Sequence, residues 1–157
     1  MAAKKKGFSI KKAKNGFTSI KLPVSVRYTM KRGFIPFGMN DNYTMKLEFS
    51  ADELPLYDTI LKKEGEIVKN IMTEMGQTYS IRTKLRRNGM YMPTIMCAVK
   101  NRKHTIKSEL YQKHKGDIHT FYDLEKTYVK VIIECKRAWV IGNHISCSWE
   151  IQSLSIL

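Results

Sequence analysis

The dipeptide Asn88-Gly89, in the middle of residues 78–100, constrains the fold of this chain more than any other feature. Both residue types tolerate the positive φ angles of a type I′ turn, so the pair is the strongest short-range signal for a two-residue β-hairpin. Such a turn would place Leu85 opposite Met92 and Arg86 opposite Tyr91. The segment 78–100 is therefore predicted to form the central hairpin of a β-rich fold.

One face of this predicted hairpin is cationic. Strand residues alternate between faces, so one side is mostly apolar and the other carries Arg82, Lys84, Arg86 and Tyr91. Two interpretations remain open at this point. The face is either solvated, as most charged strand faces are, or a surface for an anionic polymer with stackable bases.

The formal net charge of +14 and the pI of about 9.7 are typical of a domain that binds a polyanion. Residues 1–33 hold ten basic side chains and no acidic one, and residues 77–116 hold ten basic and one acidic. Residues 34–76 hold only four basic side chains against eight acidic ones. This uneven distribution indicates a basic binding face and an acidic back.

Cysteine content and hydropathy indicate an intracellular protein without a membrane span. The three cysteines, Cys97, Cys135 and Cys147, lie in predicted strands without the spacing of a metal site or a disulfide framework. No uncharged run approaches the ~20 residues of a membrane helix. The lysine cluster after Met1 lacks a following apolar segment, so it is not a secretory signal. It suits a nuclear address or a loose phosphate-binding arm.

The chain is predicted to be one domain, residues 17–157, preceded by a flexible basic arm, residues 1–16, with a short strand toward its end. Residues 17–30 alternate cleanly and predict a long strand, and Pro23 on its polar side indicates an edge or a bulge. Residues 31–42 are expected to be a loop. Its Phe34 and Phe37 either cap the core or serve as stacking platforms beside Lys31 and Arg32. Residues 43–49 predict the next strand.

Residues 50–76 form the one predicted helical stretch. Ser50 and Glu53 match a capping box, although Pro55 can instead mark the first helical turn. Gly65 is expected to weaken or break the helix, and Gly76 to end it. Its carboxylates are scattered over polar positions, which indicates a solvated acidic face rather than a catalytic or metal site.

The C-terminal region predicts two paired strands, residues 127–141 and 145–151. A two-residue Gly142-Asn143 turn would put their apolar sets on opposite faces, whereas a three-residue loop that includes His144 aligns them. We expect the three-residue loop because burial fixes register. In that arrangement Trp139 and Ile141 face inward, and Arg137 lies against Trp149 as a cation–π pair.

The end of the last strand changes phase. Leu154 and Ile156 are expected to face inward there, which requires a bulge near Gln152.

About six strands and one helix after the second strand predict a mainly β (α+β) fold, namely an OB-like Greek-key barrel or a related sandwich. OB barrels bind single strands with cations along the phosphates and aromatic rings against the bases. The predicted nucleic-acid-binding residues combine both kinds of side chain. They are Lys21, Arg27, Lys31, Arg32, Phe34, Phe37, Arg82, Lys84, Arg86, Arg87, Tyr91, Arg102, Lys103, Lys107 and Arg137.

The C-terminal region also resembles a known family. The segments 122–126, 128–135, 138–141 and 145–149, together with Gln152, are similar to the closing strands of single-stranded DNA-binding proteins of large DNA viruses. Those proteins resemble the OB-fold single-stranded DNA-binding protein of T7-type phages. The resemblance implies a non-catalytic protein that coats single strands during viral DNA replication, recombination or repair. It would act in the host nucleus or at a cytoplasmic replication site.

Other functions stay open at the level of sequence. A virion core protein that packages double-stranded genome would use the same charge without base stacking, and an RNA-binding transcription accessory module is a further alternative. An enzyme is not expected, because Gly-rich phosphate loops, HExxH and GxSxG are absent. The expected partner is single-stranded nucleic acid, DNA preferred, with self-association of bound copies along the strand. No membrane, small-molecule substrate, metal or cofactor is expected.

Overall fold

Strands dominate the part of the chain that the computed structural model describes, residues 7–12, 16–40, 42–87, 89–99 and 124–157. The strands are β1 (Ser9–Lys12), β2 (Phe17–Ile35), β3 (Thr44–Phe49), β4 (Ser80–Ile81), β5 (Leu85–Arg86), β6 (Thr94–Ala98), β7 (Thr127–Ile141) and β8 (His144–Ile156). A 3-10 turn, η2 (Ala51–Glu53), leads into the helix α1 (Leu54–Met75). The fold is thus mainly β with one α-helix in these residues, as predicted.

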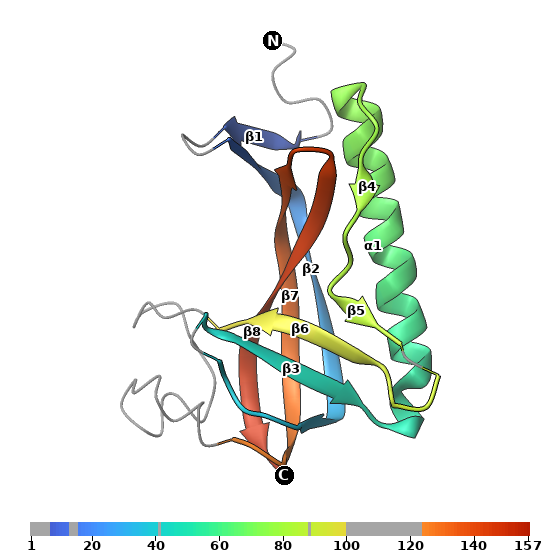
Figure 1. The fold of residues 1–157 in the computed structure, drawn as a ribbon, viewed down its shortest axis with the longest axis vertical. Helices are drawn as coiled ribbons and strands as arrows, with labels where there is room; N and C mark the ends of the chain where they lie inside the picture. The colour runs from blue at the N-terminus through green and yellow to red at the C-terminus, as the bar shows by residue number, and fades with distance from the viewer. Residues whose placement is uncertain (1–6, 13–15, 41, 88, 100–123) are drawn as a thin grey trace.

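The strands form one sheet in the order β4-β8-β7-β2-β3-β6-β5, with β1 added to the free side of β2. β6 also meets β8 in parallel through Ala98 and Glu150, so the sheet curves back on itself. Figure 1 shows β2, β7 and β8 running along the length of the molecule, while β3 and β6 cross them. Helix α1 runs beside the sheet, with the short strands β4 and β5 next to it.

Strand β2 is longer than predicted, because it runs on to Ile35 and residues 33–35 pair with β7 instead of belonging to a loop. Its register against β7 shifts twice. The first shift lies between Lys21 and Val26, around Pro23, which confirms the predicted bulge. The second lies between Met30 and Gly33. Two consecutive residues, Lys31 and Arg32, therefore bulge outward together, and both side chains are exposed.

The predicted central hairpin has the wrong register. Leu85 pairs with Ile95 rather than Met92, and the ladder ends one residue earlier, where the Lys84 carbonyl accepts the Met96 amide at 3.0 Å. Instead β4 pairs in parallel with β8, where the Arg82 amide donates to the Ile145 carbonyl at 2.8 Å. Burial explains the difference, because this register places Leu85 and Ile95 together in the core. Asn88 lies outside the described residues.

The predicted register of the C-terminal hairpin is also wrong. Ile141 pairs with His144, so the turn is the two-residue Gly142-Asn143 turn, with Gly142 at φ 58°. A bulge between Cys135 and Arg137 restores the alignment of the two apolar faces. This extra residue turns Ala138 and Val140 inward and Trp139 outward, and it separates Arg137 from the predicted cation–π partner Trp149.

The predicted bulge near Gln152 is confirmed by the register shift between Ile132 and Ile133 on the facing strand. Leu154 is buried as expected, but Ile156 is half exposed.

Helix α1 passes through Gly65 without a break and ends at Gly76, which adopts the left-handed conformation and donates its amide to the Met72 carbonyl. The end at Gly76 was predicted and the break at Gly65 was wrong. The predicted capping box does not form, since the Ser50 side chain makes no capping hydrogen bond. The Glu53 carboxylate instead accepts the amides of Lys31 and Arg32, at 2.8 and 3.2 Å. It thereby satisfies backbone donors that the second bulge of β2 leaves without a strand partner.

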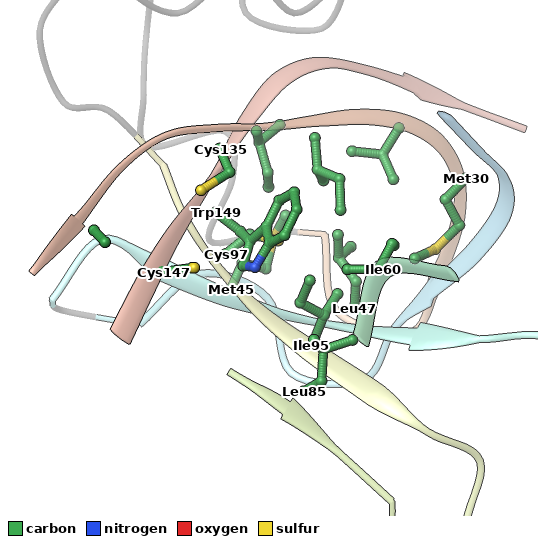
Figure 2. Close-up of a cluster of buried hydrophobic side chains, with 14 of the residues drawn as sticks. Met30, Met45, Leu47, Ile60, Leu85, Ile95, Cys97, Cys135, Cys147 and Trp149 are labelled. Carbon is green, nitrogen blue, oxygen red and sulfur yellow. The ribbon is translucent and has the colours of Figure 1, made fainter. Parts of the chain in front are cut away.

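The core lies between the curved sheet and α1. Figure 2 shows side chains from β3, β6, β7, β8 and α1 converging there, with the Trp149 indole among them. All three cysteines are buried in this region, as expected from their strand positions. Within the described segments, no helix is both long enough and apolar enough to cross a membrane.

Candidate nucleic-acid interface

Two rows of side chains cross the outward face of β1, β2, β7 and β8, near the turn between β7 and β8. We call them the upper rows. Residues opposite one another in an antiparallel ladder share a face, so the registers place Lys11, Ser19, Trp139 and Ser146 in one row. The adjacent row is Ser9, Lys21, Arg137 and Ser148. Two lysines and one arginine therefore share a serine-rich face with one half-exposed tryptophan.

Arg137 is held in place beside this tryptophan. Its Nη1 donates a 3.1 Å hydrogen bond to the Ser19 hydroxyl, and its guanidinium carbon lies 6.0 Å from the Trp139 ring centroid. One bond leaves most of the five guanidinium donors available. The pair offers a flat ring and a fixed cation side by side, which is the combination that a base and its phosphate require.

A groove of about 250 Å³ leads from Trp139 toward β3 and β6. One wall is the β7–β8 hairpin, with Trp139, Ile141 and Ser146. The opposite wall is formed by Thr44, Met96 and Ala98 of β3 and β6. Lys84, from the segment between β4 and β5, supplies a cation to the same groove. The groove joins the upper rows to the outer face of β3 and β6.

A second ring and cation lie on that outer face. Phe37, between β2 and β3, is 69% exposed, and the Lys46 ammonium lies 5.8 Å from its ring centroid. Lys46 pairs across the ladder with Met96, which lines the groove. Phe37 and Lys46 therefore extend the surface that begins at Trp139.

The lowest row crosses five strands. Its members, in order across the sheet, are Tyr128, Phe34, Glu48, Thr94 and Arg86. The rings of Phe34 and Tyr128 are 4.8 Å apart, and the Arg32 guanidinium lies 4.4 Å over Tyr128. Because Glu53 holds the bulge that projects Arg32, the helix start fixes this cation–ring stack.

We call the combined surface the outer path: the two upper rows, the groove, the Phe37–Lys46 pair and the lowest row. Seven residues predicted from sequence lie on it or, in the case of Arg32, stack on its lowest row. They are Lys21, Arg32, Phe34, Phe37, Lys84, Arg86 and Arg137. Lys31 is exposed in the neighbouring bulge of β2, outside these rows.

Other predicted residues have different roles. Arg27 forms a 2.9 Å ion pair with the buried Glu134 carboxylate, and the Arg87 guanidinium lies 6.0 Å over the ring of Tyr57 on α1. Arg82 and Tyr91 are exposed, but β5 and β6 pair in another register and the segment before β5 pairs with β8, so the predicted alignment of the two does not occur.

Three more predicted residues, Arg102, Lys103 and Lys107, lie outside the described residues.

Sequence reasoning missed Trp139, Tyr128, Lys46 and Lys11 as site residues. Trp139 was assigned to the core because the bulge before Arg137 carries no proline or glycine to reveal it. Lys46 could have been found, since it alternates with the buried Met45 and Leu47. Tyr128 could not have been found from sequence, because its ring partner Phe34 was assigned to a loop.

A buried carboxylate lies beneath the groove. Glu64 of α1 is 2% exposed and accepts the Trp149 indole N–H at 2.9 Å. Burial raises the pKa of Glu64, although hydrogen bonds from Thr83 and Trp149 and the charge of Lys84 oppose the rise. Glu64 is thus an exception to the predicted solvated acidic face, and it links α1 to the groove wall.

Within the described ranges, no three side chains with metal-ligating groups gather closely enough to hold an ion. Comparison with known proteins adds no assignment: no protein-family model matches the sequence, and no curated protein is significantly similar to it.

Proposed function

We propose that this protein binds single-stranded nucleic acid along the outer path, without catalysis and with DNA preferred. The observation that carries the proposal is that half-exposed or exposed rings alternate with cations over one connected surface. Trp139 with Arg137, Phe37 with Lys46, and Tyr128 with Arg32 are the three pairs. Duplex nucleic acid hides its base faces, so rings on the surface favour an unpaired strand.

The strand pairings support an OB-like barrel as the finer architecture. Five strands pair in a ring, β2-β3-β6-β8-β7 and back to β2, with one parallel contact between β6 and β8. Numbered along the chain, this is the order 1-2-3-5-4. OB barrels bind oligomers on the face of strands 2 and 3 and with the loops 1–2 and 4–5. In this ring those are β3, β6, the segment with Phe37, and the β7–β8 turn near Trp139.

The binding mechanism follows from the side chains. Lysine and arginine neutralise phosphates and release counterions, which contributes affinity that falls with salt. Each ring that stacks on a base adds roughly 1–3 kcal/mol without selecting its identity. The resemblance of the C-terminal segments to viral single-stranded DNA-binding proteins makes viral DNA replication, recombination or repair the proposed setting.

Tryptophan fluorescence tests the proposal. Trp139 is half-exposed on the outer path, whereas Trp149 is 1% exposed and hydrogen-bonded in the core. We expect oligo(dT) to quench the emission of Trp139, and W139F to lose most of that quenching while it still binds. W139A should weaken binding by about 1–3 kcal/mol with little change in salt dependence.

A competition titration among single-stranded DNA, duplex DNA and RNA identifies the partner. We expect at least about tenfold preference for single-stranded DNA over duplex at moderate salt, since stacking is lost in duplex. Equal affinity for duplex, with no effect of W139A, would contradict the proposal and favour genome packaging. Tighter binding of RNA than of single-stranded DNA would favour the alternative function, an RNA-binding transcription accessory module.

A further inference from the structure

The lowest row of the outer path contains a side chain that a purely phosphate-binding surface would not contain. Glu48 lies between Phe34 on β2 and Thr94 on β6, on the same outward face. A carboxylate there repels the phosphates of any bound strand. Within the described ranges no hydrogen bond or ion pair engages it, although it is half-buried.

Glu48 faces a hollow of about 360 Å³ that it lines together with Arg32, Phe34, Met92 and Tyr128. The Arg32–Tyr128 stack and the tilted Phe34 ring give the hollow flat walls. Flat aromatic and guanidinium groups stack on nucleobases, and the hollow is large enough for one base. A half-exposed carboxylate that no described side chain bonds accepts from water, or from a donor group of a ligand that enters the hollow.

We propose that this hollow is a base-selective subsite that holds a guanine of the bound strand, with Glu48 accepting from its Watson–Crick edge. Guanine presents two adjacent donors there, N1–H and the 2-amino group, which match the two oxygens of a carboxylate. Adenine and cytosine each present one amino group on that edge, and thymine presents only N3–H. The inference rests on the proposed function and adds a position of base preference to otherwise sequence-tolerant binding.

The chemistry of the 2-amino group tests this in the wild-type protein. Oligo(dT) of about eight nucleotides, a length within the range for one OB fold, is compared with the same oligomer carrying a single dG or a single deoxyinosine. Deoxyinosine keeps N1–H and lacks the 2-amino group. We expect about tenfold tighter binding for dG than for dT, with deoxyinosine between them. Equal affinities for dG and deoxyinosine would overturn the inference.

The variant E48Q separates the two roles of the carboxylate. It removes a negative charge, so affinity for oligo(dT) should rise slightly, while the preference for dG should fall to about twofold or less because one acceptor becomes a donor. E66Q, an exposed glutamate on α1, is the matched control and should leave the preference intact. An E48Q protein that retains the full dG preference would overturn the assignment of Glu48.

Mononucleotides distinguish failure of the subsite from failure of strand binding. In saturation-transfer NMR, dGMP should contact the protein more strongly than dIMP or TMP, whether or not oligo(dT) binds. Binding of oligo(dT) with no response to dG, in a strand or free, would leave the proposed function standing and overturn the subsite. A response to free dGMP without binding of oligo(dT) would leave the subsite standing and overturn the proposed function.

Discussion

The Trp149 indole N–H donates a 2.9 Å hydrogen bond to the Glu64 carboxylate, and both side chains are almost completely buried. The bond joins the last strand, β8, to the only described α-helix. It lies directly under the groove, because Trp149 also lines the groove. A polar contact inside the core therefore positions a wall of the proposed binding surface.

Replacing Glu64 tests this contact. E64A leaves the indole N–H buried without a partner and should lower the free energy of unfolding by about 1–3 kcal/mol. E64Q retains an acceptor oxygen and should lose less. Urea denaturation at neutral pH measures both variants. Equal losses in the two variants would mean that packing, and not the hydrogen bond, is the contribution of Glu64.

The pH dependence of the same pair follows from the raised pKa of Glu64. A folded-state pKa above the unfolded value means that the folded protein retains a proton, which stabilises it below pH about 4.5. This contribution is lost as the pH rises through the raised folded-state pKa. The unfolding free energy of E64Q, relative to the wild type, should therefore increase over that range. A constant difference between the two proteins would contradict the raised pKa.

Glu134 should behave in the opposite sense. Burial alone would raise its pKa, but hydrogen bonds from Arg27 and Ser25 and the charges of Arg27 and Lys136 outweigh it and lower the pKa. Its stabilisation is present above pH about 4.5 and is lost as the pH falls through the lowered folded-state pKa. R27M should therefore lose less thermal stability than the wild type when the pH is lowered through this range, as measured by thermal melts. R82M, an exposed arginine near β4, serves as the control and should not.

Phe37 and Lys46 should contribute to binding in distinguishable ways. F37A should weaken single-strand affinity by about 1 kcal/mol, at the low end for stacking because the ring is mostly exposed, with an unchanged salt slope. K46Q should reduce the slope of log affinity against log salt by about one. V24A and K69Q, exposed residues beside and on α1, are the matched controls. Equal effects in site and control variants would exclude this part of the outer path.

Gly65 offers a test of stability alone. It lies inside α1, and a Cβ added there would meet nothing within 4 Å beyond the neighbouring residues and backbone of its own helix. G65A should raise the free energy of unfolding by about 0.5–1 kcal/mol, because alanine restricts the unfolded chain and favours the helix. Chemical denaturation measures the gain, and single-strand affinity should not change. A loss of stability would indicate that α1 needs the flexibility of glycine.

Periodicity predicted much of this fold, and irregularities limited the rest. The alternation of Met45, Leu47 and Phe49 correctly placed β3, and the glycine at position 76 correctly ended the helix. The bulge before Arg137 carries no such local signal, since it is stabilised by pairing with a distant part of the chain. A one-residue shift there reverses every later side chain, which moved Trp139 from the predicted core to the surface.

The candidate site was predictable in kind but not in geometry. Charge and aromatic content pointed to a polyanion, and seven of the predicted residues do lie on the outer path or stack on it. The predicted hairpin at Asn88-Gly89 is not the centre of the site, because β4 pairs with β8 instead. That pairing joins residues far apart in sequence. Local turn chemistry carries no information about such a partner.

The long pairing of β2 with β7, which sets Phe17 against Ile141, has a consequence for folding kinetics. Strand β2 is synthesised early and its partner β7 much later. Their pairing closes a large loop, and it is slow because chain entropy is lost before stabilising contacts form. During that interval β2 presents an unpaired edge that invites aggregation. Dense positive charge on this half of the chain would keep neighbouring nascent copies apart until β7 arrives.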